Sequence, residues 1–171
     1  MGIGAEALFP LLYDELRRLA RARLAGGGRS TLLDTHALLH ESFLRLQQAG
    51  HAAINDREHF LAYAATTMRS IVVDHVRSRR ALRRGGDVAI VTLDTAAANE
   101  LGSSEDEILE IHDALETLGK VEPRLVQVVE MRYFAGLSEV EVASALGVTE
   151  RTVRRDWERA RLLLAGMLGR A

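Results

Sequence analysis

The chain has 171 residues, of which 47% are hydrophobic and only 5% aromatic. This composition is ample for a globular core and favours helix over strand. The absence of cysteine excludes a disulfide framework and a thiolate metal site. No stretch approaches the ~18 apolar residues of a membrane-spanning helix, and the N-terminus lacks the pattern of a signal peptide. We therefore expect a cytoplasmic protein without membrane insertion.

The net charge is −2, but it is unevenly distributed. Residues 1–86 carry 13 arginines against 8 acidic residues, and residues 122–171 carry 8 arginines against 7. Residues 87–121 carry 9 acidic residues against one lysine, Lys120. An acidic middle segment thus separates a basic block from a nearly neutral one, so the small net charge does not exclude a nucleic-acid partner.

The first block predicts three helices, over residues 5–24, 32–48 and 57–82. Apolar residues recur in each at helical spacing, and the first helix is expected to stop at the glycines 26–28. The third helix ends in a basic cluster before Gly85-Gly86. The residues expected on apolar stripes are Leu8, Leu11, Leu12, Leu16 and Leu19, then Leu39, Phe43 and Leu46, then Phe60, Ala64, Met68, Ile71 and Val72.

Residues 85–103 lack helical periodicity and are interpreted as a linker. The segment "DVAIVTLD" could pass for a short strand, but no partner strand is evident. Ser104 is expected to cap a helix whose first turn is acidic, and a further helix is expected from Pro123 to about Phe134. The sequence therefore predicts an all-α chain with two small domains, 1–84 and 104–171, joined by a mobile linker.

The stretch "AGLSEVEVASALGVTERTVRR" has the pattern of a helix-turn-helix. Ser138 and Glu141 form a capping-box pair at the start of a short helix. Gly147 can take the positive φ of a tight turn, and Thr149 can cap a second helix. A short helix, a turn with glycine and a capped second helix are typical of DNA-binding motifs.

The second helix of this motif separates its residues into two faces. At 100° per residue, Val153, Trp157, Ala160 and Leu164 share an apolar face. The arginines project from the other side, where guanidinium groups can bind phosphate or guanine. An alternative is a solvated helix with Arg–Glu pairs. The residues expected to contact DNA are Thr149, Arg151, Thr152, Arg154, Arg155, Glu158 and Arg159.

Nearly the whole chain resembles a sigma factor of the sigma-70 class, of the short extracytoplasmic-function type. "DTHALLHESFLRLQ" resembles the family region that docks on RNA polymerase, and "HFLAYAATTMRSIVVDHVRSRRALRRGG" resembles the part that recognises and opens the −10 promoter element. The segment from "LETLGKVEPRLV" to "RRDWERAR" resembles the region that reads the −35 element. The resemblance implies core RNA polymerase and promoter DNA as partners, with an anti-sigma protein as a further candidate.

The resemblance also implies roles for particular residues. His40, Glu41 and Arg45 correspond to the polar side of the polymerase-docking helix. Arg154, Arg155 and Arg159 match positions that face the −35 duplex. Ser70 stands where many relatives have asparagine. The residues assigned to the −10 element are Ser70, Asp74, Arg77, Arg80, Arg83 and Arg84.

No enzyme signature, metal site or cofactor site is expected. His36 and His40 are four residues apart, but no HExxH pattern and no third ligand accompany them. Two functions remain: a promoter-specificity subunit of RNA polymerase, and a stand-alone helix-turn-helix regulator whose N-terminal block senses a signal or dimerises. The two separated basic surfaces favour the first. A further hypothesis is that the acidic linker covers a basic surface in the free protein.

Overall fold

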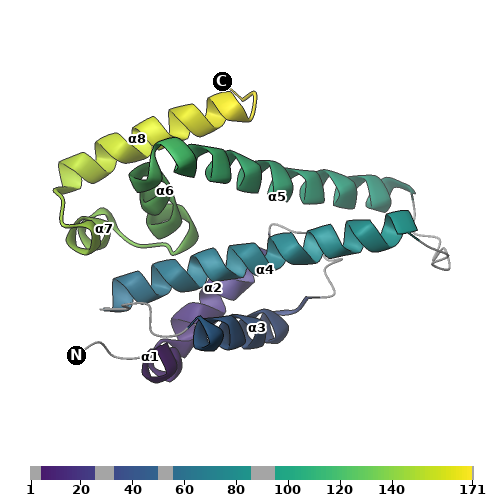
Figure 1. Cartoon of the computed structure of the whole chain (residues 1–171), viewed down its shortest axis with the longest axis horizontal. Helices are drawn as coiled ribbons and strands as arrows, with labels where there is room; N and C mark the ends of the chain where they lie inside the picture. The colour runs from purple at the N-terminus through teal and green to yellow at the C-terminus, as the bar shows by residue number, and fades with distance from the viewer. Residues whose placement is uncertain (1–4, 26–32, 50–55, 86–94, 171) are drawn as a thin grey trace.

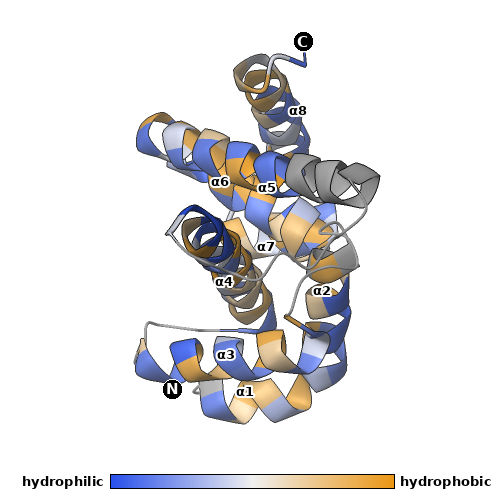
Figure 2. Cartoon of the chain, turned by 90° about the vertical axis from the view of Figure 1, so that its right-hand side faces the viewer, coloured by the Kyte–Doolittle hydropathy of each residue, from blue (hydrophilic) through white to orange (hydrophobic). Residues whose placement is uncertain are grey.

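The computed structural model describes residues 5–25, 33–49, 56–85 and 95–170, and every regular element within these ranges is a helix (Figure 1). The expected all-α fold is confirmed. The helices are amphipathic, with hydrophobic and hydrophilic residues on the same element (Figure 2). The elements are α1 (Ala5–Leu11), α2 (Tyr13–Ala25), α3 (Thr35–Gln48), α4 (Arg57–Gly85), α5 (Thr95–Val121), α6 (Pro123–Val129), the π-helical turn η1 (Glu130–Phe134), α7 (Glu139–Leu146) and α8 (Glu150–Met167).

The first predicted helix is divided into α1 and α2 at Leu12. Pro10 lies inside α1, where it lacks an N–H and its ring crowds the carbonyl of residue 6, so the helix is interrupted. Leu8, Leu12 and Leu16 are buried, as their spacing predicts. The placement of Leu11 on the core face was wrong, because its side chain is 75% exposed.

The long helix α4 is the centre of the molecule. It packs against α1, α2 and α3 on one side and against α5, η1 and α7 on the other (Figure 1). The five residues expected to face inward, Phe60, Ala64, Met68, Ile71 and Val72, are all buried. Buried residues of the N-terminal and C-terminal helices belong to one continuous hydrophobic cluster.

The predicted linker is wrong in its second half. Gly85 is the last residue of α4, and residues 95–103 belong to α5. Ser104 therefore lies inside α5 and does not begin a helix. The segment from Thr95 lacks a strong apolar stripe, so its periodicity does not indicate a helix. It is rich in alanine, which favours helix intrinsically. Residues 86–94, which include the possible strand, lie outside the described residues.

None of the helices in the described ranges is long and apolar enough to cross a membrane. The division into domains 1–84 and 104–171 stays a prediction. In the structure the two halves are in contact along α4, which passes between them (Figure 1).

Candidate nucleic-acid interface

The two short-range caps of the C-terminal motif form as predicted. The Glu141 N–H donates to Ser138 Oγ at 3.2 Å, and the Ser138 N–H donates to Glu141 Oε2 at 2.8 Å. Gly147 ends α7 with φ of 65°. The Thr152 N–H donates to Thr149 Oγ1 at 3.2 Å at the start of α8. Because these contacts satisfy backbone groups at the helix ends, they fix the angle at which α8 leaves the turn.

The helix α8 presents its arginines to solvent and its apolar face to the protein. Val153 and Ala160 are fully buried, and Trp157 and Leu164 are half-buried against the same cluster. Asp156 is also buried, and its Oδ2 lies 2.8 Å from Arg124 Nε, which ties α8 to α6. The exposed predicted DNA-contact residues are Thr149, Arg151, Arg154, Arg155, Glu158 and Arg159, whereas Thr152 is half-buried.

Three of the outward arginines take part in ion pairs, two with half-buried glutamates and one with the buried Asp156. Arg154 Nε lies 3.1 Å from Glu139 Oε2, and Arg155 Nη2 lies 3.6 Å from Asp156 Oδ1. Arg159 pairs with Glu122. These arginine side chains are 60–70% exposed, and exposed pairs contribute only about 0–1 kcal/mol each. Displacing Arg154 and Arg159 from their glutamates should therefore cost little, and the buried Asp156 keeps its contact with Arg124 when Arg155 leaves it.

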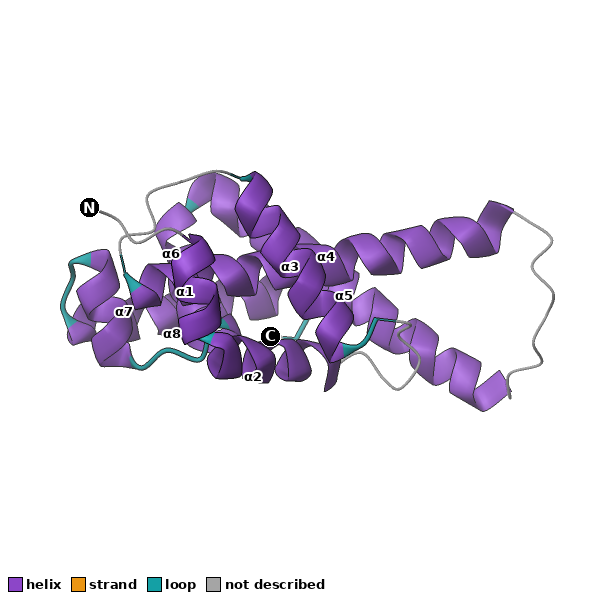
Figure 3. Ribbon diagram, turned by 90° about the horizontal axis from the view of Figure 1, so that it is seen from below, coloured by secondary structure: helices purple, strands orange, loops and turns teal. Residues whose placement is uncertain are grey.

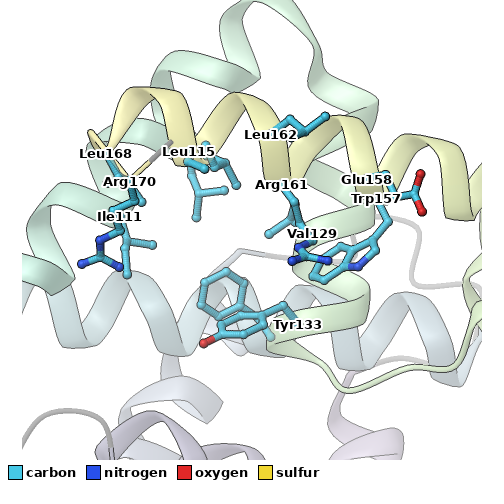
Figure 4. A pocket seen from close by; sticks show the side chains of 13 residues that line it. Ile111, Leu115, Val129, Tyr133, Trp157, Glu158, Arg161, Leu162, Leu168 and Arg170 are labelled. Carbon is cyan, nitrogen blue, oxygen red and sulfur yellow. The ribbon is translucent and has the colours of Figure 1, made fainter.

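Trp157 is less buried than a core tryptophan. The centroid of its ring lies 4.9 Å from the Arg132 guanidinium carbon. Its side chain lines an open apolar groove between α5, η1 and the second half of α8 (Figure 4). The expected inward orientation holds, but part of the ring contacts this groove instead of the packed interior.

The residues assigned to polymerase docking and to the −10 element meet at the α3–α4 contact. Arg45 of α3 lies 3.2 Å from Glu41 on its own helix and 3.0 Å from Asp74 on α4. Its Nη1 also donates to Ser70 Oγ at 3.4 Å. His40 is exposed at the same helix. Arg45 of the docking set thus contacts Asp74 and Ser70 of the −10 set, although the sequence assigns the two sets to separate roles.

The arginines at the C-terminal end of α4 face acidic residues of α5. Glu105 is 4% exposed, and Arg83 Nη2 donates to both of its carboxylate oxygens at 2.7 Å. Arg79 and Arg80 lie 3.3 Å and 3.7 Å from the same carboxylate. Arg80 also pairs with Asp106, and Arg77 lies 3.6 Å from Asp113. Arg84 is exposed.

The sequence predicted Glu105 and Asp106 in a helix but gave no partner for them, so these pairs were missed. The acidic bias of residues 87–121 was visible in the sequence, but the partners of those acids depend on how α5 packs. Figure 3 shows α4 and α5 extending at the same end of the molecule. The charge distribution is consistent with a favourable contact between the basic end of α4 and the acidic residues further along α5.

A second polar contact between the halves is buried near the middle of α4. Arg69 Nε and Nη2 donate to Glu130 Oε1 at 3.0 Å and 2.6 Å, and both side chains are nearly buried, at 11% and 7% exposed. Arg69 Nη1 lies 2.6 Å from His112 Nδ1. A guanidinium only donates, so Nδ1 accepts and the imidazole is neutral. Burial, and next the Arg69 charge, lower the pKa of His112 below 6.5.

A third contact joins α2, α4 and α7 through Arg57. Its Nη2 donates to Glu15 Oε2 at 2.6 Å, and its Nη1 donates to Glu141 Oε1 at 3.0 Å. The hydrogen bonds with Ser138, followed by those from Arg57, hold the pKa of Glu141 below its ordinary value of 4.5. The capping-box glutamate therefore has two roles, one within α7 and one between the halves.

No group of three His, Asp or Glu side chains in the described parts of the chain is close enough to hold a metal ion. His36 and His40 are both exposed on α3.

Comparison with known proteins identifies the family. A family model described as ECF sigma factor matches residues 3–168. The chain belongs to the ECF sigma factor family. It is 32% identical over 147 residues to the ECF RNA polymerase sigma factor BldN of Streptomyces coelicolor, across 83% of this chain. This sigma-factor-family chain spans about half the length of that relative, 52%. No solved structure matches it.

Proposed function

We propose that the chain is a promoter-specificity subunit that binds core RNA polymerase and directs transcription initiation at promoters with −35 and −10 elements. The observation that carries the proposal is the extent of the family match, from residue 3 to 168. The match covers both the α4 arginine cluster and the outward face of α8. Sigma factors are regulatory subunits, so the chain needs no catalytic residues of its own.

The geometry supports separate DNA-binding roles for two surfaces, one on α8 and one at the end of α4. Arg154 and Arg155 lie near the start of α8 and are exposed, which is where a recognition helix enters the major groove. Arg77, Arg80 and Arg84 lie at the end of α4, where closely spaced guanidinium groups suit backbone phosphates. We assign the α8 pair to the upstream element and the α4 group to the downstream element. The docking set, His40, Glu41 and Arg45, is proposed to face the polymerase.

The location and the remaining partners follow from this function. A subunit of RNA polymerase acts in the cytoplasm, and an anti-sigma protein is a further candidate partner. The stand-alone regulator is not favoured, because the family match covers the predicted polymerase-docking helix as well as the DNA-contacting motif.

Arg155→Ala and Arg80→Ala test the division between the two surfaces. The readout is transcription by the reconstituted holoenzyme on a promoter library randomised at the upstream element. Arg155→Ala should change which upstream sequences work, because a lost base contact removes ~1–3 kcal/mol of discrimination. Arg80→Ala should weaken all promoters similarly and lower the salt slope of binding by ~0.7–0.9.

The control is Arg18→Ala, which removes an exposed arginine from α2, far from both sets in sequence. It should leave promoter choice and strength near those of the unmodified chain. If Arg80→Ala changed upstream preference while Arg155→Ala weakened all promoters equally, the two assignments would be reversed.

A further inference from the structure

Three of the four α4 arginines expected at the −10 element, all except Arg84, are already paired with carboxylates of the same chain. Arg77, Arg80 and Arg83 each contact an acid of α5, and Arg79 joins them at Glu105. We name Glu105, Asp106 and Asp113 the acidic strip. In the described part of the chain, each member of the strip pairs with at least one α4 arginine.

The contact between the strip and α4 has the chemistry of a phosphate contact. Arg83 Nη2 lies 2.7 Å from both oxygens of the Glu105 carboxylate, and the guanidinium groups of Arg79 and Arg80 approach the same anion from neighbouring turns. Arginine binds carboxylate and phosphate with the same planar set of donors. An anion held by three guanidinium groups occupies the space that a DNA phosphate would take.

The acidic strip can compete with DNA for the α4 arginines because it belongs to the same chain. A tethered group acts at an effective concentration in the millimolar range. When only a fraction of molecules has the arginines open, the apparent dissociation constant for DNA rises in inverse proportion to that fraction. The strip can therefore weaken DNA binding without altering any arginine.

We propose that the acidic strip of α5 is an internal competitor that blocks DNA from the α4 arginines in the free chain. It is released when the chain binds polymerase and promoter. The inference rests on the proposed function, because it assumes that the α4 arginines bind DNA. It adds a closed state, in which the strip covers the arginines, and an open state, in which they are available.

The first test compares two variants of the full chain that carry equal charge changes. The strip variant is Glu105→Gln, Asp106→Asn and Asp113→Asn. The control variant is Glu107→Gln, Glu110→Gln and Glu116→Gln, three exposed acids of the same helix for which the structure records no contact with α4. Affinity for a labelled single-stranded DNA of mixed sequence, about 20 nucleotides long, is measured by fluorescence anisotropy at fixed salt.

The strip variant should bind this DNA about tenfold more tightly than the unmodified chain, because the open fraction rises. The control variant also loses three negative charges. It should tighten DNA binding no more than about threefold through general electrostatics. Equal affinities of the two variants would overturn the inference, because the gain would then come from net charge alone.

A second measurement does not depend on the strip variant folding normally. The chain has no cysteine, so Leu82→Cys and Glu110→Cys place two spin labels at exposed positions of α4 and α5. The distance between the labels should lengthen when the same DNA is added to saturation. An unchanged distance in the DNA-bound chain would overturn the inference.

A third variant separates failure of the inference from failure of the proposed function. Arg80→Gln with Arg83→Gln should weaken binding of the single-stranded DNA severalfold. If it does not, the α4 arginines do not bind DNA and the premise fails. If it does, while the strip variant matches its control, the function stands and only the internal competitor is wrong.

Discussion

At the scale of single residues, Arg69 is the most consequential side chain that the sequence did not single out. It sits on α4 and holds Glu130 of η1 in a nearly buried ion pair. The second oxygen of Glu130, Oε2, is buried with no hydrogen-bond partner among the described residues. Removing the guanidinium would leave a buried carboxylate without a partner, which strongly destabilises the fold.

We therefore expect Arg69→Ala to lower the free energy of unfolding by about 3–5 kcal/mol. The measurement is urea denaturation of Arg69→Ala, Glu130→Ala and the double variant. The double variant should be more stable than the sum of the single losses predicts, because neither charge is left unpaired. Additive losses would mean that the pair contributes no coupling between the halves.

His112 makes the same contact sensitive to pH. Its pKa is lowered in the folded chain, so its stabilising contribution is complete above the unfolded value, about 6.5, and declines as the pH falls below it. Thermal unfolding of His112→Gln should lose part of this decline, because glutamine does not gain a proton. His36→Gln, at an exposed position on α3, is the matched control. Identical pH profiles for His112→Gln and the unmodified chain would contradict the assignment.

At the scale of elements, local chemistry predicted the helix ends of the C-terminal motif but failed at Ser104, which lies inside α5. The capping box at Ser138, the αL glycine at 147 and the Thr149 cap depend on residues within a few positions of each other, and all three form. The break at Leu12 follows from Pro10, which lacks an N–H and interrupts the helix. The start of α5 was missed because it has an alanine-rich composition and no apolar stripe.

The Ser138 cap is expected to carry measurable stability. Ser138→Ala removes the acceptor for the Glu141 N–H and should lower the free energy of unfolding by about 1 kcal/mol. Ser144→Ala changes an exposed serine inside the same helix and should alter stability by no more than about 0.5 kcal/mol. Equal effects from both serines would show that the capping box does not hold α7.

At the scale of the whole molecule, the sequence predicted the surfaces but not how they meet. The outward arginines of α8 follow from helical geometry alone, and their exposure is confirmed. The pairings Arg57–Glu141, Arg69–Glu130 and Arg83–Glu105 join residues 84, 61 and 22 positions apart. Such contacts are set by tertiary packing of α4, which no local pattern encodes. The two-domain division therefore remains a prediction about a chain whose halves are in contact.

The central claim is that the chain works as a subunit of RNA polymerase. The most direct measurement mixes the chain with core polymerase and a fragmented bacterial genome, then maps the 5′ ends of the transcripts. The chain should co-elute with core polymerase, and transcripts should start at fixed positions downstream of a shared two-part sequence only when both are present. The contrary result is a chain that does not co-elute with the polymerase yet selects specific DNA sequences on its own, which would make it a stand-alone regulator.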